Sequence, residues 1–153
     1  MGIVMLDKLT GHDAKLSRIY EKVQTLITQY NPDEIAIEAP FYGKNAQSML
    51  KLGRAQGVAM VVAYNMDIPV FEYAPKKIKQ SVTGNGNASK EQVAAMLKQL
   101  MTIDKDSKYL DATDALAVAT CHYFQSDNQS ISRGEVYRDW KSFIKTNPDR
   151  VKK

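Results

Sequence analysis

The chain contains little cysteine and no long apolar run. Cys121 is the only cysteine among 153 residues, so a disulfide within one chain is excluded, and a reducing compartment such as the cytoplasm is expected. The longest apolar stretch, Val58–Tyr64, is far shorter than the roughly 20 residues that a membrane-spanning helix needs. The residues after Met1 have neither the basic start nor the cleavage site of a signal peptide. No association with a membrane is expected.

The sequence also lacks a strong charge of either sign, internal repeats and low-complexity tracts. Lys and Arg number 21 against 17 Asp and Glu, a net charge of +4, which permits a polyanionic partner without requiring one. The apolar share of 44% and the charged share of 25% are ordinary for a globular protein. A length of 153 residues is enough for one domain with a sizeable core.

Strand-like and helix-like segments alternate over the first 124 residues. Short apolar runs bounded by polar or turn residues predict strands at Gly2–Leu6, Ile35–Glu38 and Ile68–Glu72. Apolar residues spaced three and four apart, together with capping residues, predict helices near 16–30, 44–65, 75–82, 89–101 and 109–124. This alternation indicates an α/β domain with a mostly parallel sheet.

The character of the chain changes after Phe124. Residues 126–133 are polar and are predicted to be a loose connector, followed by a short amphipathic helix over 136–144 and a basic tail. The predicted organisation is therefore a domain over 1–125 and an appendix over 126–153. The sequence leaves open whether that last helix docks on its own domain or contacts DNA or a partner.

Three acidic residues form a candidate metal site. Glu38 lies at the carboxyl end of an apolar strand, where open α/β sheets bind their ligands. Asp111 and Asp114 are three residues apart on a predicted helix, so their side chains share one face. Carboxylates brought together repel one another unless a cation lies between them, and such oxygen-rich sites suit Mg²⁺ or Mn²⁺.

Ordinary structural roles are equally available to these residues. Asp111 is a possible N-cap, Asp114 can interact favourably with the helix dipole, and Glu38 can be the solvated end of a strand. Spacing alone leaves both interpretations open.

Two stretches of the chain resemble the RuvC family of Holliday-junction resolvases. The first, residues 35–57, has a strand ending in Glu, a loop containing Phe and a helix that reads LKLGRAQG. The second, Asp111–Ala117, reads DATDALA and is similar to the last catalytic helix of that family. Residues 71–79 and 84–90 also match in order and spacing, so the resemblance covers roughly residues 1–124.

The resemblance implies a ribonuclease-H-like α/β fold, in which helices flank a mixed central sheet. It implies a structure-specific endonuclease that resolves four-way junction DNA in recombination and repair, using two Mg²⁺ ions per site, with Mn²⁺ as a substitute. It also implies a homodimer that works beside a branch-migration helicase complex. The matching residues are Glu38, Asp111 and Asp114 as catalytic metal ligands, Phe41 as an aromatic that stacks on an unpaired base, and Lys79 and Lys90 as phosphate contacts.

Several of these residues also have plainer interpretations. Phe41 beside Tyr42 can be a local hydrophobic plug, and Lys79 with its neighbouring lysines can be a solvated face. The helix over 44–65 is apolar all round after Gly57, which predicts burial against the sheet and against a dimer partner. The alternative is that only the helix's own domain covers it, with no partner involved.

One feature departs from the family pattern. The first strand of the family carries an Asp in a Gly-x-Asp-x-Gly context, and no such motif occurs in this sequence. Gly2–Leu6 resembles the third strand instead, so the first two strands are expected to be missing, and Asp7 follows the wrong strand to replace the absent Asp. This departure raises the alternative of a catalytically impaired junction-binding protein. An unrelated α/β protein with coincidental acids is a third hypothesis.

Overall fold

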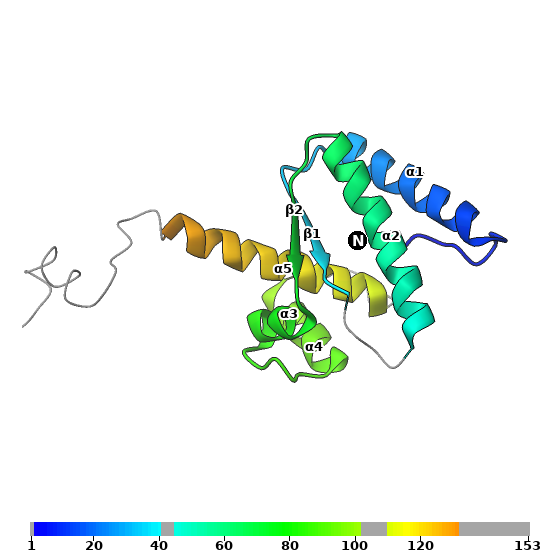
Figure 1. The fold of residues 1–153 in the computed structure, drawn as a ribbon. Helices are drawn as coiled ribbons and strands as arrows, with labels where there is room; N and C mark the ends of the chain where they lie inside the picture. The colour runs from blue at the N-terminus through cyan, green and yellow to red at the C-terminus, as the bar shows by residue number, and fades with distance from the viewer. Residues whose placement is uncertain (1, 41–44, 102–109, 132–153) are drawn as a thin grey trace, which may run out of the picture. The chain divides into compact units, whose positions relative to one another are not determined.

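The computed structural model describes residues 2–40, 45–101 and 110–131, with side chains in the last of these ranges described over 112–126. The chain divides into two compact units, Met1–His122 and Tyr123–Lys153. Helices and strands alternate as the sequence predicts, which confirms the α/β class (Figure 1). In chain order the elements are α1 (His12–Tyr30), β1 (Ile35–Glu38), α2 (Ala46–Asn65), β2 (Val70–Tyr73), α3 (Pro75–Thr83), α4 (Lys90–Leu100) and α5 (Leu110–Ile131).

The sheet of the described residues consists of β1 and β2, which pair in parallel. Ile35 lies opposite Val70 and Glu38 lies opposite Tyr73. Pro69 cannot donate to the ladder, but its carbonyl accepts a hydrogen bond from the Ile35 amide at 2.9 Å, so this proline fits at the start of its strand. Because the strands are parallel, their carboxyl ends lie at the same edge of the sheet.

The prediction of a strand at Gly2–Leu6 is wrong. These residues are irregular and run into a turn in which the Leu9 amide donates to the Leu6 carbonyl at 3.2 Å. Met5 is exposed, with 59% of its surface accessible. An apolar run becomes a strand only when a neighbouring strand satisfies its backbone groups, and no strand in the described part of the chain pairs with this one.

The helix ends follow the capping residues in the sequence. The Asn45 side chain accepts a hydrogen bond from the Ser48 amide at the start of α2. Helix α3 begins with proline and ends at Gly84, whose φ of 75° is a left-handed conformation that glycine adopts without strain. Ser89 and Gln92 form the predicted capping box of α4.

The predicted connector after Phe124 is wrong in its first part. Helix α5 continues to Ile131, whereas the polar composition suggested a loop from Ser126. The physical reason is that no glycine or proline interrupts the chain before Gly134, and polar residues alone do not end a helix. The helix predicted over 136–144 lies outside the described residues.

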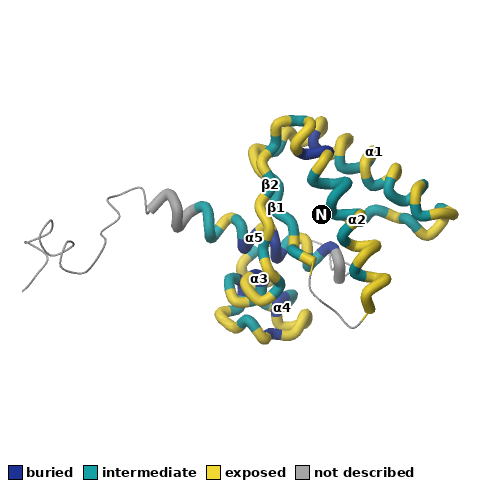
Figure 2. The backbone as a smooth tube through the Cα atoms, viewed as in Figure 1, coloured by how far each residue is buried: buried dark blue, intermediate teal, exposed yellow. Residues whose placement is uncertain are grey.

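Two clusters of buried residues stabilise the unit Met1–His122 (Figure 2). The larger cluster joins α3, α4 and α5 around Leu97 and Cys121, both fully buried, and Ala36 and Tyr73 of the two strands pack against it. The smaller cluster joins α1 to α2 through Ile27, Val62 and Ala63. None of the described helices is both long enough and apolar enough to cross a membrane.

Candidate functional site

Glu38 is the last residue of β1 and lies at the carboxyl edge of the strand pair. The next amide, that of Ala39, still donates to the Tyr73 carbonyl at 2.9 Å, so the end of the strand is held in place up to this point. The Glu38 side chain is exposed, yet surrounding protein atoms remove part of its hydration. This desolvation raises the pKa of Glu38, as does the nearby Asp114 carboxylate, whereas Lys90 and Lys79 act in the opposite direction.

Asp114 comes to the same place from helix α5. Ala112 and Ala117, on either side of it in the helix, are buried, so small side chains let this helix lie close to its neighbours. The Lys90 ammonium forms an ion pair with the Asp114 carboxylate. That pair links the first turn of α4 to α5 across 24 residues of sequence.

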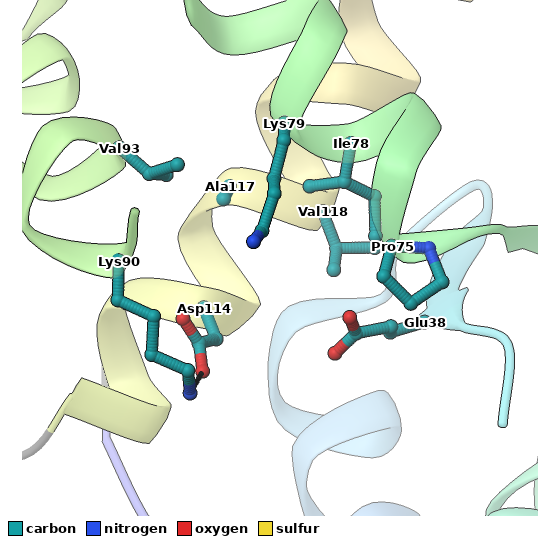
Figure 3. Close-up of a pocket in the computed structure, with 9 residues that line it drawn as sticks. All are labelled: Glu38, Pro75, Ile78, Lys79, Lys90, Val93, Asp114, Ala117 and Val118. Carbon is teal, nitrogen blue, oxygen red and sulfur yellow. Dashed lines mark hydrogen bonds and ion pairs between the residues drawn. The ribbon is translucent and has the colours of Figure 1, made fainter. Parts of the chain in front are cut away.

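Two of the three predicted acids and both predicted lysines line one pocket. In Figure 3, the Glu38 carboxylate and the Lys79 ammonium point into the space between the strand end and α5, and the Asp114 carboxylate on the other side of this space faces Lys90. The cavity has a volume of about 80 Å³, which is room for several water-sized particles. The lining residues are Glu38, Pro75, Ile78, Lys79, Lys90, Val93, Asp114, Ala117 and Val118.

The structure thus brings together four of the six residues that the sequence singles out: Glu38, Asp114, Lys79 and Lys90. Asp111 lies on α5 one helical turn before Asp114, and its side chain is outside the described residues. Phe41 is also outside them. Among the side chains described, which do not include that of Asp111, no group of three metal-ligating residues forms.

The donor set that is described fits a hard divalent cation. Two carboxylates from separate elements line one pocket, and the Asp114 carboxylate contributes to the raised pKa of Glu38. A cation between them would remove this repulsion, and oxygen ligands are those that Mg²⁺ and Mn²⁺ prefer. The residues present are therefore compatible with a metal site.

Sequence reasoning missed two relationships in this region. The first is the Lys90–Asp114 ion pair, since the sequence predicts only a phosphate contact for Lys90. The hydrogen bonds of His122 to Tyr73 and Glu34 are the second relationship. These partners lie 24 to 88 residues apart, so no local sequence signal could have paired them.

Comparison with known proteins identifies the family. The family model described as crossover junction endodeoxyribonuclease RuvC matches residues 1–122. A RuvC protein of Cytophaga hutchinsonii is 60% identical over 151 residues, covering 99% of this chain and 74% of the relative. The chain belongs to the RuvC family. The RuvC protein of Porphyromonas gingivalis is 53% identical over 155 residues and covers 99% of this chain and 82% of that protein.

Solved RuvC structures have the same fold as this RuvC chain. The structure described as T. thermophilus RuvC in complex with Holliday junction substrate has a TM-score of 0.76 at 28% identity, covering 82% of this chain and 76% of that one. A second structure, of Thermus thermophilus RuvC, has a TM-score of 0.75 at 27% identity. The predicted ribonuclease-H-like fold and the class of junction endonuclease, a hydrolase, are confirmed. The comparisons do not support a catalytically impaired protein, and the hypothesis of an unrelated α/β protein is wrong.

Proposed function

We propose that this chain cuts Holliday junctions by metal-dependent hydrolysis of phosphodiester bonds, with Glu38, Asp111 and Asp114 as the metal ligands. One observation carries the assignment of the site: the carboxylates of Glu38 and Asp114 and the ammonium groups of Lys79 and Lys90 line a single pocket. The relatives are named crossover junction endodeoxyribonucleases, and one solved neighbour holds a Holliday junction, which supports the substrate class.

The acids would hold two Mg²⁺ ions, which Mn²⁺ can replace. Bound divalent ions activate a water molecule and stabilise the leaving oxygen of the phosphodiester. Glu38 and Asp114 contribute rigid ligands, because one ends a paired strand and the other lies on a helix packed in the main core. Asp111, one turn earlier on the same helix, is the expected third ligand.

The lysines and Phe41 would bind the DNA. Lys79 and Lys90 carry positive charge into the pocket of the acids, where a phosphate would lie beside the metal ions. Such contacts neutralise backbone charge and position the DNA without reading its sequence. Phe41 follows β1 by three residues, and an aromatic side chain in that loop could stack on an unpaired base near the crossover.

A homodimer is the assembly that this function needs, since symmetric cleavage requires two sites related by a twofold axis. Helix α2 supports this proposal with an exposed apolar face. Leu50, Val61 and Tyr64 are each more than half exposed. At 100° per residue, these three residues and Gly57 lie within a sector of about 60° around the helix axis. We place the enzyme in the cytoplasm, with a branch-migration helicase complex as a further partner implied by the family.

The test of the site is cleavage of a synthetic four-way junction in Mg²⁺ by the full-length protein. Glu38→Gln, Asp111→Asn and Asp114→Asn should each lower the cleavage rate by at least about a hundredfold, because a lost ligand removes several kcal/mol of transition-state stabilisation. Junction binding without metal should remain, since the carboxylates do not attract phosphate. Glu21→Gln, an exposed acid on α1, is the matched control and should cleave normally. Full cleavage by the three site variants would disprove the assignment.

A further inference from the structure

One histidine joins helix α5 to both strands of the sheet. The Nδ1 atom of His122 lies 2.7 Å from the hydroxyl of Tyr73, at the end of β2. Its Nε2 atom lies 2.7 Å from a carboxylate oxygen of Glu34, the residue before β1. A single side chain therefore connects three elements of the unit Met1–His122.

The chemistry of the partners fixes the roles of the two ring nitrogens. An ionised Glu34 carboxylate only accepts hydrogen bonds, so Nε2 of His122 must be the donor in that pair. In the neutral imidazole Nδ1 then accepts from the Tyr73 hydroxyl. Burial raises the pKa of Tyr73, and the Cys121 and Glu34 groups add to this rise, so its hydroxyl keeps the proton that it donates.

Packing holds the imidazole ring between these partners. Only 14% of the His122 side chain is exposed, compared with 41% for Glu34. The Phe71 ring of β2 lies with its centroid 4.8 Å from that of His122, and the Tyr73 ring lies at 5.7 Å. Hydrogen bonds in such a partly dry environment cost more to break than those on an open surface.

The same three elements carry the residues of the proposed active site. Strand β1 starts beside Glu34 and ends at Glu38, and Tyr73 is the register partner of Glu38. Asp114 precedes His122 by eight residues on α5, which is about 12 Å along a straight helix. A shift of α5 along the strands would therefore change the separation of Glu38 and Asp114 unless His122 prevented it.

We infer that His122, through Tyr73 and Glu34, is a positioning residue that sets the distance between Glu38 and Asp114 in the proposed active site. The inference rests on the function proposed above. His122 need not touch metal or DNA, because it acts by fixing the helix that carries Asp114. Misplacing one reacting group by about 1 Å can cost a hundredfold in rate.

The experiment compares two variants in the full-length protein. His122→Phe keeps an aromatic ring but removes both hydrogen bonds, and Tyr73→Phe removes only the hydroxyl of one partner. Four quantities are measured for each: the junction dissociation constant without metal, the single-turnover cleavage rate in Mg²⁺, the dissociation constant for Mn²⁺ by calorimetry, and the melting temperature. Tyr123→Phe, which removes the hydroxyl of an exposed tyrosine from the next position of α5, is the matched control.

A positioning role predicts a specific combination of results. The cleavage rate should fall about ten- to hundredfold in His122→Phe and less in Tyr73→Phe, and Mn²⁺ should bind more weakly in both. Junction affinity should stay within about twofold of the parent protein. If the melting temperature falls while the cleavage rate and Mn²⁺ affinity of the folded protein are unchanged, His122 is merely structural and the inference is wrong.

His122→Gln and the acid variants separate this inference from the proposed function. Glutamine can donate from Nε2 to Glu34 as the imidazole does, so it should recover part of the rate lost in His122→Phe. Failure of this partial rescue would count against the inference. If Asp114→Asn abolishes cleavage while His122→Phe cleaves normally, the proposed site stands and the inference fails. If Asp114→Asn cleaves normally, the proposed site itself is wrong.

Discussion

Lys90 on α4 and Asp114 on α5 form an ion pair in the pocket that Glu38 also lines. The side chains of Lys90 and Asp114 are 52% and 32% exposed, so water weakens the pair and its net contribution to stability is small, about 0–1 kcal/mol. The Lys90 ammonium therefore binds the same Asp114 carboxylate that we propose as a metal ligand. Metal binding would therefore have to compete with this pair and release the ammonium group toward bound phosphate.

This competition predicts that Lys90→Met binds metal more tightly when DNA is absent. If metal binding no longer has to break an ion pair worth up to about 1 kcal/mol, the affinity for Mn²⁺ should rise about two- to fivefold. Calorimetric titration of the protein with Mn²⁺ measures this change. Lys98→Met, which removes the same charge from the far end of α4, should leave the affinity unchanged. Equal or weaker binding by Lys90→Met would show that the ion pair does not oppose the metal.

Phosphate contact by Lys79 and Lys90 predicts a change in the salt dependence of junction binding. Replacing either residue with alanine removes one neutralised phosphate, so the slope of log K against log salt should become shallower by about one. Binding of a labelled junction, measured from low to moderate salt, gives this slope. It is measured without divalent metal for Lys79, and with Ca²⁺ in place of Mg²⁺ for Lys90, because Lys90 pairs with Asp114 when no metal is bound. Lys98→Ala serves as the control of equal charge. A slope that stays at the parent value would show that the replaced lysine does not contact phosphate.

The raised pKa of Glu38 predicts that its ionisation destabilises the metal-free fold. The folded state holds the Glu38 proton to a higher pH than the unfolded chain does, so stability is lost as the pH rises through the folded pKa. Glu38→Gln cannot ionise and should therefore melt at a higher temperature than the parent protein near neutral pH in EDTA. The difference should vanish below the ordinary range of glutamate pKa values.

Thermal melts of both proteins between acid and neutral pH, with Glu21→Gln as control, provide the measurement. A lower melting temperature for Glu38→Gln at neutral pH would mean that the favourable effect of Lys79 and Lys90 on the Glu38 carboxylate exceeds its desolvation.

Dimerisation through the exposed face of α2 predicts that Gly57→Lys yields monomers. Apart from the adjacent residues and the backbone of its own helix, a Cβ atom at Gly57 would meet no atom within 4 Å in the single chain, so the lysine can be accommodated unless a partner covers this face. Burying its charge in an interface should weaken dimerisation by at least about a hundredfold. Sedimentation velocity over a range of concentrations measures the effect, with Gln24→Lys on exposed α1 as control. A monomeric parent protein, or an unchanged dimer of Gly57→Lys, would exclude this interface.

Much of the local structure was determined by the sequence itself. The proline at the start of α3, Gly84 at its end and the Ser89–Gln92 capping box each act within a few residues, so their signals are complete in a short window. The parallel pairing of β1 with β2 was also predictable, because a helix separates the two apolar runs. The RuvC motifs by themselves identify the family.

Only the tertiary structure decided which of these residues meet. The two predicted acids whose side chains are described, Glu38 and Asp114, lie 76 positions apart in the numbering of the sequence, and packing around Leu97 and Cys121 brings their elements to one pocket. The strand predicted at Gly2–Leu6 failed for a related reason, since a strand exists only with a partner that the local sequence does not specify. The contacts of His122 with Tyr73 and Glu34 depend on three elements at once. Sequence patterns encode local geometry, whereas distances between remote side chains are set by how the buried surfaces of those elements pack together.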